Sequence, residues 1–255
     1  MKVLIYQSEM HSGIGEAISK LERIVENNPA DIYVFPELFL TNYLIRDEIY
    51  RQSLSKDSEK IEKIVDISRK KNCTIIAGFP EKFEREIYNS ALVAANGEKY
   101  VYRKIHLPNF GPFEEKIYFS AGDEELIVDI GETKIGVQIC YDLFFPELSK
   151  TLALRGAEII VNISASPVIS KKYFETLIPA RAIETTTFFV YANWAGTQRN
   201  MVFWGGSRVV KPSGDVVSIG KYFEEDLVIA EINLDEIDAF RRVRPVLKDT
   251  VWRWF

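Results

Sequence analysis

Cysteine, histidine and long apolar runs are scarce in this chain. It has two cysteines, Cys73 and Cys140, and no Cys-x-x-Cys pair, which excludes a disulfide framework and a zinc site of the usual spacing. No apolar stretch approaches the about 20 residues of a membrane-spanning helix. Residues 1–7 become polar too early for a signal peptide and predict a first strand instead. We therefore expect a protein of the reducing cytoplasm with neither a membrane nor a metal partner.

An excess of positive charge is also absent. The chain has 32 lysines and arginines against 37 aspartates and glutamates, a net charge of -5, and its basic residues are dispersed. Nucleic-acid binding needs clustered basic residues, so we expect no nucleic-acid partner. A chain of 255 residues with 47% apolar residues can bury a large core. It contains no linker, repeat or low-complexity tract, so we predict one domain over residues 1–255.

Short apolar runs alternate with amphipathic segments along most of the chain, which is typical of an α/β protein. Asn96-Gly97 and Pro212–Asp215 predict hairpin turns, so the sheets should be mixed rather than purely parallel. We predict two mixed sheets packed on each other with helices outside. The predicted strands are 3–6, 32–36, 74–79, 88–95, 99–104, 134–139, 159–163, 188–192, 207–210, 216–219 and 227–232. The predicted helices are 14–27, 58–71, 146–155, 173–186 and 234–243.

Cys140 lies between an apolar strand-like run and a helix-like one. A turn at this place lifts the side chain out of the sheet, and the positive end of the following helix favours the thiolate. Cys140 is therefore a candidate nucleophile, although a free cysteine is more often a small buried apolar side chain. Cys73 begins an apolar run and is interpreted as a core residue.

Charged residues near the ends of other strands could serve such a nucleophile. Glu37 follows the strand 32–36 in an apolar run, which suits a general base; the alternative is a carboxylate at a helix N-terminus. Lys104 ends the strand 99–104 and could stabilise an oxyanion, although a lysine there is usually a solvated charge. Glu115 lies among aromatic residues, with a surface ion pair to Lys116 as its alternative.

Only His11 and His106 could form a cysteine–histidine pair with the candidate nucleophile. His11 lies in a polar segment, and His106 lies two residues past Lys104. No protease-like signature surrounds Cys140. A carboxylate base with a lysine electrophile agrees better with the pattern, because a cysteine nucleophile needs a partner that removes its proton.

Three segments that contain these residues resemble the signatures of the nitrilase superfamily of carbon–nitrogen hydrolases. They are Phe35–Glu37, Tyr102–Leu107 and Ile139–Glu147, and they occur in the family order of glutamate, lysine and cysteine. Glu115 resembles an additional glutamate that the family carries between the lysine and the cysteine. Further similarity at residues 121–123, 152–157, 181–184 and 205–208 extends the resemblance from about residue 7 to at least residue 215.

The resemblance implies an αββα sandwich that pairs with a second subunit in a larger layered homodimer. It also implies cofactor-free hydrolysis through a thioester on Cys140. Glu37 would be the general base, and Lys104 and the backbone N–H of Tyr141 would bind the oxyanion. Glu115 would orient the substrate or Lys104.

The substrate is less sharply indicated. Tyr141-Asp142 resembles the amidase-type branches, which implies a small-molecule amide. Two alternatives within the family stay open, a true nitrilase and a catalytically silent binding homologue; a redox sensor is a further one. Leu143–Phe145 lacks the arginine of the omega-amidase branch, and its two phenylalanines suggest an apolar mouth. The candidate substrate-binding residues, each with core packing as its alternative, are Tyr43, Phe110, Phe144, Phe145, Ser166, Asn193 and Trp194.

The C-terminal tail, about residues 245–255, is unusually apolar. Trp252, Trp254 and Phe255 are large side chains that rarely lie free in water. We predict that the tail docks on a partner subunit, with docking on its own core as the alternative.

Overall fold

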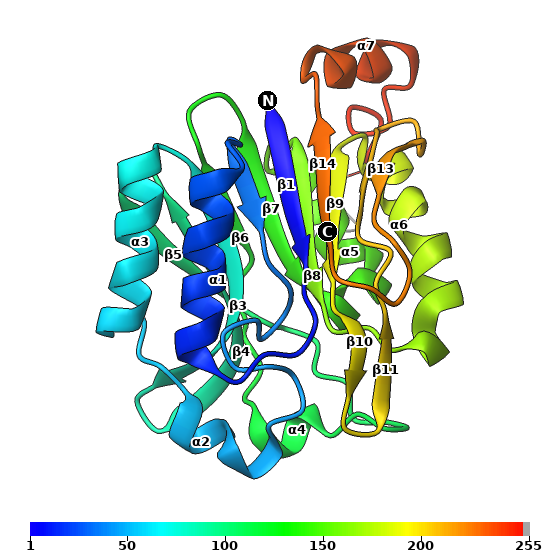
Figure 1. Ribbon diagram of the computed structural model, residues 1–255. Coiled ribbons are helices and arrows are strands. Elements are labelled where there is room, and N and C mark those ends of the chain that lie inside the picture. The colour runs from blue at the N-terminus through cyan, green and yellow to red at the C-terminus, as the bar shows by residue number, and fades with distance from the viewer. Residues whose placement is uncertain (252–255) are drawn as a thin grey trace.

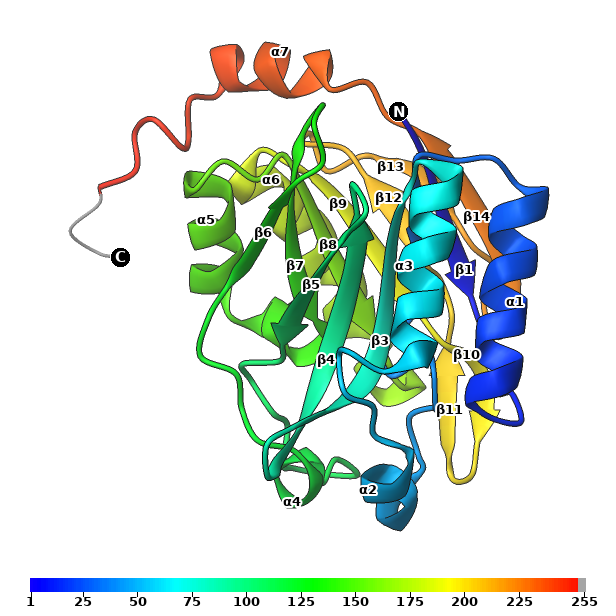
Figure 2. The same cartoon turned by 90° about the vertical axis from the view of Figure 1, so that its left-hand side faces the viewer.

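Two mixed sheets pack face to face in the computed structural model, which describes residues 1–251 (Figures 1 and 2). Each of these sheets has six strands, and helices cover the outer faces, as the αββα prediction required. The first sheet has the order β14 (Asp226–Glu231), β1 (Lys2–Gln7), β2 (Ile32–Val34), β3 (Thr74–Phe83), β4 (Glu86–Ala95) and β5 (Glu98–Arg103). The second has the order β13 (Val216–Ile219), β12 (Arg208–Val210), β9 (Phe188–Asn193), β8 (Ile159–Ser164), β7 (Lys134–Ile139) and β6 (Leu126–Asp129).

The helices follow the apolar spacing of the sequence. In α1 (Ile14–Asn27), buried residues recur at intervals of three and four positions, including Ile18, Leu21 and Val25, so one face packs inward. Helices α1 and α3 (Glu59–Lys71) cover the first sheet, and α5 (Pro146–Leu154) and α6 (Lys171–Thr185) cover the second. Shorter elements are α2 (Ile49–Gln52), α4 (Glu115–Tyr118), α7 (Asp235–Val243) and the 3-10 turns η1 (Arg46–Glu48), η2 (Cys140–Phe144) and η3 (Val168–Ser170).

The centre of each sheet is parallel. Strands β1, β2 and β3 run in one direction, as do β7, β8 and β9, while the outer pairs are antiparallel. Because parallel strands end at the same edge, the loops that follow them gather at one end of the sandwich. The sheets therefore bring distant segments of the chain together at that end.

Two features differ from the sequence prediction. The hairpin of β10 (Ala195–Gln198) and β11 (Met201–Trp204) forms a separate two-stranded sheet, and β6 is an additional edge strand. Strand β10 has no apolar alternation, whereas β6 and β11 are short apolar runs that the sequence prediction did not include. By contrast, the Asn96-Gly97 turn between β4 and β5 is confirmed, with φ of 53° and 78°, as a two-residue turn with both central φ values positive requires.

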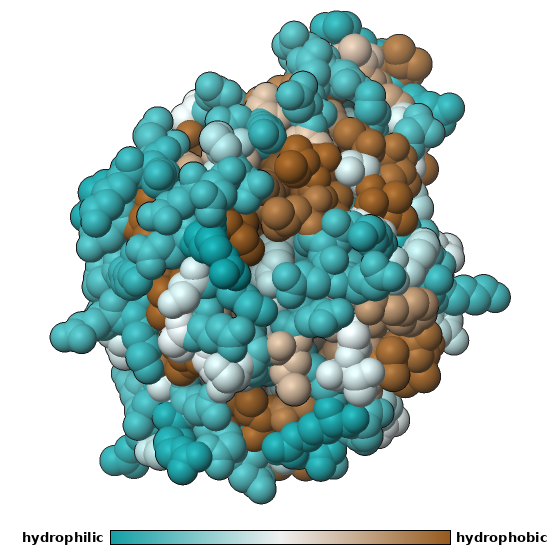
Figure 3. Space-filling model, viewed as in Figure 1, coloured by the Kyte–Doolittle hydropathy of each residue, from teal (hydrophilic) through white to brown (hydrophobic). Residues whose placement is uncertain are grey.

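The face shown in Figure 3 is mostly hydrophilic with several apolar areas, one of which lies over the edge strands β13 and β14. Val216, Ile219, Leu227 and Ile229 contribute to this area and are 37% to 47% exposed. Within residues 1–251, no helix is both long and apolar enough to cross a membrane. Residues 252–255 lie outside the described residues, so the docking of the tail stays a prediction, as does the homodimer.

Candidate active site

The ends of three strands bring Glu37, Lys104 and Cys140 to one end of the sandwich. Glu37 follows β2 and Lys104 follows β5, so both come from the first sheet. Cys140 follows β7 of the second sheet directly. The site therefore lies across the two sheets, with the candidate nucleophile on one and the candidate base and lysine on the other.

Lys104 is fully buried between two carboxylates. Its Nζ lies 2.7 Å from Glu37 Oε1 and 2.8 Å from Glu115 Oε1. Burial alone would lower the pKa of Lys104, but the charges of Glu115 and Glu37 outweigh burial and raise it above its ordinary value. Lys104 is therefore an ammonium at neutral pH. Glu115 pairs with this buried lysine, which replaces the alternative of a surface pair with Lys116.

The Glu37 carboxylate is held by three donors. Lys104 Nζ and Asn89 Nδ2 both lie 2.7 Å from Oε1, and the backbone N–H of Ala165 donates to Oε2 at 2.7 Å. Trp194 Nε1 donates to the backbone oxygen of Glu37, also at 2.7 Å. These bonds come from both sheets and fix the carboxylate in one orientation.

A tight turn, and not a helix, follows Glu37. Leu38 has a φ of 51°, and its backbone packs against Gly78 of β3. A Cβ at Gly78 would lie 2.2 Å from the Leu38 nitrogen, so any side chain there would force the backbone of this turn to shift. The alternative of a carboxylate at a helix N-terminus is therefore wrong for Glu37.

Glu115 carries an acceptor without a partner. Tyr43 donates through its hydroxyl to Oε1 at 2.7 Å, the oxygen that also contacts Lys104. Oε2 is buried and accepts no hydrogen bond from the residues that the structure describes. Burial raises the pKa of Glu115 to about 7, although Lys104 opposes this. An unpaired buried acceptor is unfavourable by about 1–3 kcal/mol, so a ligand that donates a hydrogen bond here would gain that free energy.

Cys140 has an unusual backbone. It begins the η2 turn with a φ of 48°, a conformation that residues other than glycine rarely adopt and that is often found at functional sites. Its side chain is almost fully buried. Burial raises the pKa of the Cys140 thiol well above its usual range and Glu37 raises it further, although Lys104 lowers it. The expectation of a thiolate is therefore wrong, because desolvation outweighs the helix end, and α5 begins only at Pro146. A protonated thiol at this place requires a base.

Asp142 connects the turn of Cys140 with the strand end of Lys104. Its Oδ2 accepts hydrogen bonds from the Tyr102 hydroxyl at 2.7 Å and the Ile139 backbone at 3.0 Å. Its Oδ1 accepts a hydrogen bond from the backbone N–H of His106 at 2.9 Å and lies 2.8 Å from His106 Nδ1, a second hydrogen-bonding contact. One buried carboxylate thus binds residues on both sides of Lys104 and the residue before Cys140.

Neither histidine is arranged to pair with the nucleophile. His106 Nδ1 is bonded to Asp142, and its ring stacks on Phe145 with 3.5 Å between the centroids. His11 Nε2 lies 2.6 Å from the backbone oxygen of Phe39. The carboxylate and the lysine, and not a histidine, are therefore the charged groups that the fold gathers around Cys140.

Aromatic side chains line a cavity of about 580 Å³ beside the turn of the candidate nucleophile. Tyr141 lies between Phe110 and Phe145, with its ring centroid 5.2 Å from the ring centroid of each. Phe144, outside this cavity, packs on Tyr141 with the ring centroids 5.3 Å apart. The apolar character suggested for Phe144 and Phe145 thus agrees with their surroundings, and a cavity of this size and lining is typical of a small-molecule site.

Ser166, Asn193 and Trp194 form part of the fully buried wall behind Glu37. Asn193 Oδ1 accepts from the Ser166 backbone at 2.8 Å and its Nδ2 donates to the Ser166 oxygen at 3.2 Å. Ser166 Oγ accepts a hydrogen bond from Trp204 at 3.1 Å. These polar atoms therefore have hydrogen-bonding partners within the chain, and the bonds between Ser166 and Asn193 connect the ends of β8 and β9.

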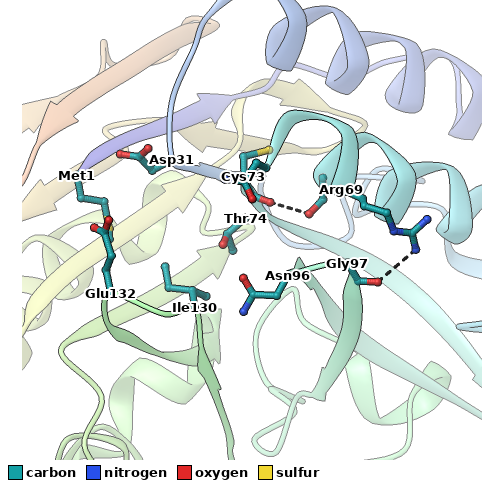
Figure 4. A pocket seen from close by; sticks show the side chains of 11 residues that line it. Met1, Asp31, Arg69, Cys73, Thr74, Asn96, Gly97, Ile130 and Glu132 are labelled. Atoms are coloured by element: carbon teal, nitrogen blue, oxygen red, sulfur yellow. Dashed lines mark hydrogen bonds between the residues drawn. The ribbon is translucent and has the colours of Figure 1, made fainter.

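A larger cavity, about 640 Å³, lies at the start of β3 (Figure 4). This is the opposite end of the sandwich from Glu37, Lys104 and Cys140. Asp31, Arg69, Asn96 and Glu132 contribute to its polar rim, and Cys73 is the cysteine that lines it. Burial raises the pKa of Cys73 to about 11, and the residues that line this cavity include no lysine. Among residues 1–251, no three His, Cys, Asp or Glu side chains cluster in a way that could hold a metal ion.

The sequence reasoning missed three groups of the site. These are Asn89 and the Ala165 N–H, which orient Glu37, and the contacts of Asp142. Each of these groups forms hydrogen bonds to residues from other strands of the fold. Asp142 was visible as a neighbour of Cys140, but no spacing in the sequence indicates its partners Tyr102 and His106.

Comparison with known proteins identifies the family of this chain. Residues 4–242 match the family model of the carbon-nitrogen hydrolases. The chain is 39% identical over 238 residues to a glutamine-dependent NAD(+) synthetase of Thermotoga maritima, covering 89% of this chain but 40% of that protein. The chain thus spans less than half the length of that relative. It is also 36% identical over 224 residues to a nitrilase of Pyrococcus abyssi, covering 85% of this chain and 83% of that one.

Solved structures show the same fold. Nit3 of Saccharomyces cerevisiae, described as a member of the nitrilase superfamily, has a TM-score of 0.87 and 25% identity, covering 100% of this chain and 97% of that one. An amidase of Nesterenkonia sp. AN1, also 25% identical, has a TM-score of 0.81 over 95% and 97% of the two chains, and acrylamide is attached to its active site cysteine. The fold, the order of the motifs and the match along residues 4–242 together place this chain in the carbon–nitrogen hydrolase family of the nitrilase superfamily.

Proposed function

We propose that the protein hydrolyses the carbon–nitrogen bond of a small amide through a thioester on Cys140, releasing ammonia and a carboxylic acid. The observation that carries this proposal is the buried group of Glu37, Lys104 and Glu115 beside Cys140. It combines a protonated thiol, a carboxylate that can take its proton and an ammonium that can bind a developing negative charge.

The first half of the reaction forms the thioester. Glu37 removes the thiol proton while Cys140 Sγ forms a bond to the amide carbon. Negative charge develops on the amide oxygen, where Lys104 and the backbone N–H of Tyr141 stabilise it. The carbon–nitrogen bond then breaks, and the proton held by Glu37 passes to the nitrogen, which leaves as ammonia.

The second half of the reaction uses one water molecule. Glu37 takes a proton from the water as its oxygen attacks the thioester carbon, and the same oxyanion contacts apply. The carbon–sulfur bond breaks, the proton returns to Cys140 Sγ, and the carboxylic acid leaves. The sum is one amide and one water converted to one acid and one ammonia, with Glu37 and Cys140 restored.

The unpaired oxygen of Glu115 favours an amide over a nitrile. A primary amide carries two N–H donors and can satisfy the buried Oε2 atom, whereas a nitrile nitrogen only accepts. A site built to bond an N–H rejects analogues that lack it, because a buried polar group is then left without a partner. A nitrilase is the second candidate function, supported by the 36% identity to the protein from Pyrococcus abyssi.

The test compares wild type with Cys140→Ala on paired substrates. The panel holds glutamine, since that is the amide named for one relative, together with acrylamide, aliphatic and aromatic amides and the nitriles of the same acids. We expect ammonia release from an amide, an acyl adduct on intact wild-type protein, and loss of both in Cys140→Ala. Cys73→Ala, the matched control, should behave as wild type.

Two results would contradict the proposal. Ammonia release that persists in Cys140→Ala would show that the reaction needs no thioester on Cys140. Faster ammonia release from nitriles than from the matching amides would favour the nitrilase.

A further inference from the structure

The proposed reaction needs groups from both sheets at a fixed separation. Lys104 belongs to the first sheet and Cys140 to the second, and the oxyanion must touch both the lysine and the turn of the cysteine. Glu37 has its own links to the second sheet, through the Ala165 N–H and Trp194. Those bonds hold Glu37. The strand end that carries Lys104 is linked to the second sheet by a different set of hydrogen bonds.

The carboxylate of Asp142 supplies contacts of that kind. On the first sheet it binds Tyr102 and His106, the residues two positions before and two positions after Lys104. On the second sheet it lies two residues after Cys140 and accepts the N–H of Ile139. The lysine is thus bracketed on both sides by residues that are bonded to the turn of the nucleophile.

We propose that Asp142 is a positioning residue that sets the separation of Lys104 from Cys140 by clamping Tyr102 and His106 to the η2 turn. This inference rests on the proposed hydrolysis for its kinetic consequence. Asp142 touches neither substrate nor the reacting atoms in this role. It acts on the geometry of the oxyanion site, where a shift of about 1 Å can lower the rate about 100-fold.

The residue type agrees with this role. Asp142 is fully buried, and its two oxygens have four hydrogen-bonding partners, an acceptor capacity that a carboxyl group provides and a carboxamide does not. An asparagine would turn its amide group toward two of these donors. Burial, and next the charge of Asp142, raise the pKa of Tyr102 well above its usual range, so Tyr102 stays a donor at every pH of interest.

His106 offers a way to test the clamp without removing Asp142. Its Nδ1 lies 2.8 Å from Asp142 Oδ1, within hydrogen-bonding distance, while its ring stacks on Phe145. His106→Ala loses both contacts, whereas His106→Asn loses the stacking but has a side-chain N–H at nearly the place of Nδ1. A difference between these two variants therefore reports on the hydrogen bond alone.

The experiment uses Asp142→Asn, His106→Ala, His106→Asn and Tyr102→Phe in the whole chain. The matched control is Tyr33→Phe, because Tyr33 is another buried tyrosine of the first sheet whose hydroxyl is bonded, to the Asn28 oxygen at 2.7 Å, away from the site. Three readouts are kcat, KM and the rate at which iodoacetamide alkylates Cys140, with thermal unfolding as a check on folding.

We expect kcat to fall about 100-fold in Asp142→Asn and about tenfold in His106→Ala and Tyr102→Phe, with KM nearly unchanged, because only the transition state senses the separation. His106→Asn should recover most of the loss of His106→Ala. Alkylation should slow in the same order, and Tyr33→Phe should match wild type in all three readouts.

Alkylation separates the two proposals. If no amide is hydrolysed but alkylation still falls in this order, the clamp stands and the proposed function fails. If wild type hydrolyses an amide and all the clamp variants keep its kcat, the clamp is overturned. Losses in Tyr33→Phe equal to those in Tyr102→Phe would also overturn it, since they indicate general destabilisation. No recovery in His106→Asn would overturn it as well, because the stacking on Phe145 and not the hydrogen bond would then account for the loss. If Asp142→Asn does not fold, the histidine and tyrosine variants decide alone.

Discussion

Lys104 Nζ lies 2.7 Å from Glu37 Oε1, although 67 positions separate the two residues in the chain. Both side chains are fully buried, and Glu115 is bound to the same ammonium. A charge is buried only when it is paired, because transfer from water is otherwise very unfavourable. The stability of this end of the sandwich and its proposed chemistry therefore depend on the same three side chains.

Lys104→Met should destabilise the protein by about 3–5 kcal/mol, since it leaves two carboxylates buried without a cation. It should also abolish amide hydrolysis. The matched control is Lys99→Met, because Lys99 likewise pairs with two carboxylates, Asp57 and Glu62, but at the surface where solvent screens them. Urea unfolding measures the loss of stability in both variants. Equal shifts in the two midpoints would mean that the Lys104 pairs are no stronger than a solvated network.

Glu115 predicts a pH dependence of stability. Its pKa is raised from 4.5 to about 7, so the folded protein holds this proton more tightly than the unfolded chain. Ionisation therefore opposes folding, and this contribution to stability should decline as pH rises from about 4.5 to about 7. Glu115→Gln should lack the decline. Unfolding free energies of wild type and variant across this range check it, and parallel curves would contradict it.

Tyr43→Phe should move the pH profile of activity. The Tyr43 hydroxyl donates to Glu115 Oε1 and lowers the pKa of that carboxyl, against the larger effect of burial. Its loss should raise the pKa of Glu115, so the acid limb of kcat/KM should lie at higher pH in the variant. Tyr33→Phe is the control. An acid limb in the same place for all three proteins would show that Glu115 does not govern it.

Gly78→Ala should displace the turn that carries Glu37. The added Cβ would lie 2.2 Å from the Leu38 nitrogen and 2.6 Å from the Pro36 oxygen, and backbone must shift to admit it. We expect a loss of about 1–3 kcal/mol in stability and a clear fall in kcat. Gly15→Ala in α1 meets no atom within 4 Å and should stabilise the helix by about 0.5–1 kcal/mol. Full activity in Gly78→Ala would show that the position of Glu37 tolerates the shift.

The fold class and the order of most elements could be predicted from the spacing of apolar residues. The α1 helix and strands β7 and β13 have the bounds that the pattern predicted. The β10–β11 hairpin could not be predicted in this way, because Ala195–Gln198 lacks apolar alternation. What holds it is tertiary: Gln198 Oε1 accepts the backbone N–H of Tyr43 at 3.0 Å.

The sequence by itself determined that Glu37, Lys104 and Cys140 end strands, and strand ends in an α/β protein meet at one edge. Only the tertiary structure decided how they face one another. The separation of Lys104 from Glu115, the three donors to Glu37 and the clamp of Asp142 depend on how two sheets pack, which no local spacing encodes. The same reason explains the wrong expectation for Cys140, because the pKa of a thiol follows its burial, and burial is a property of the whole fold.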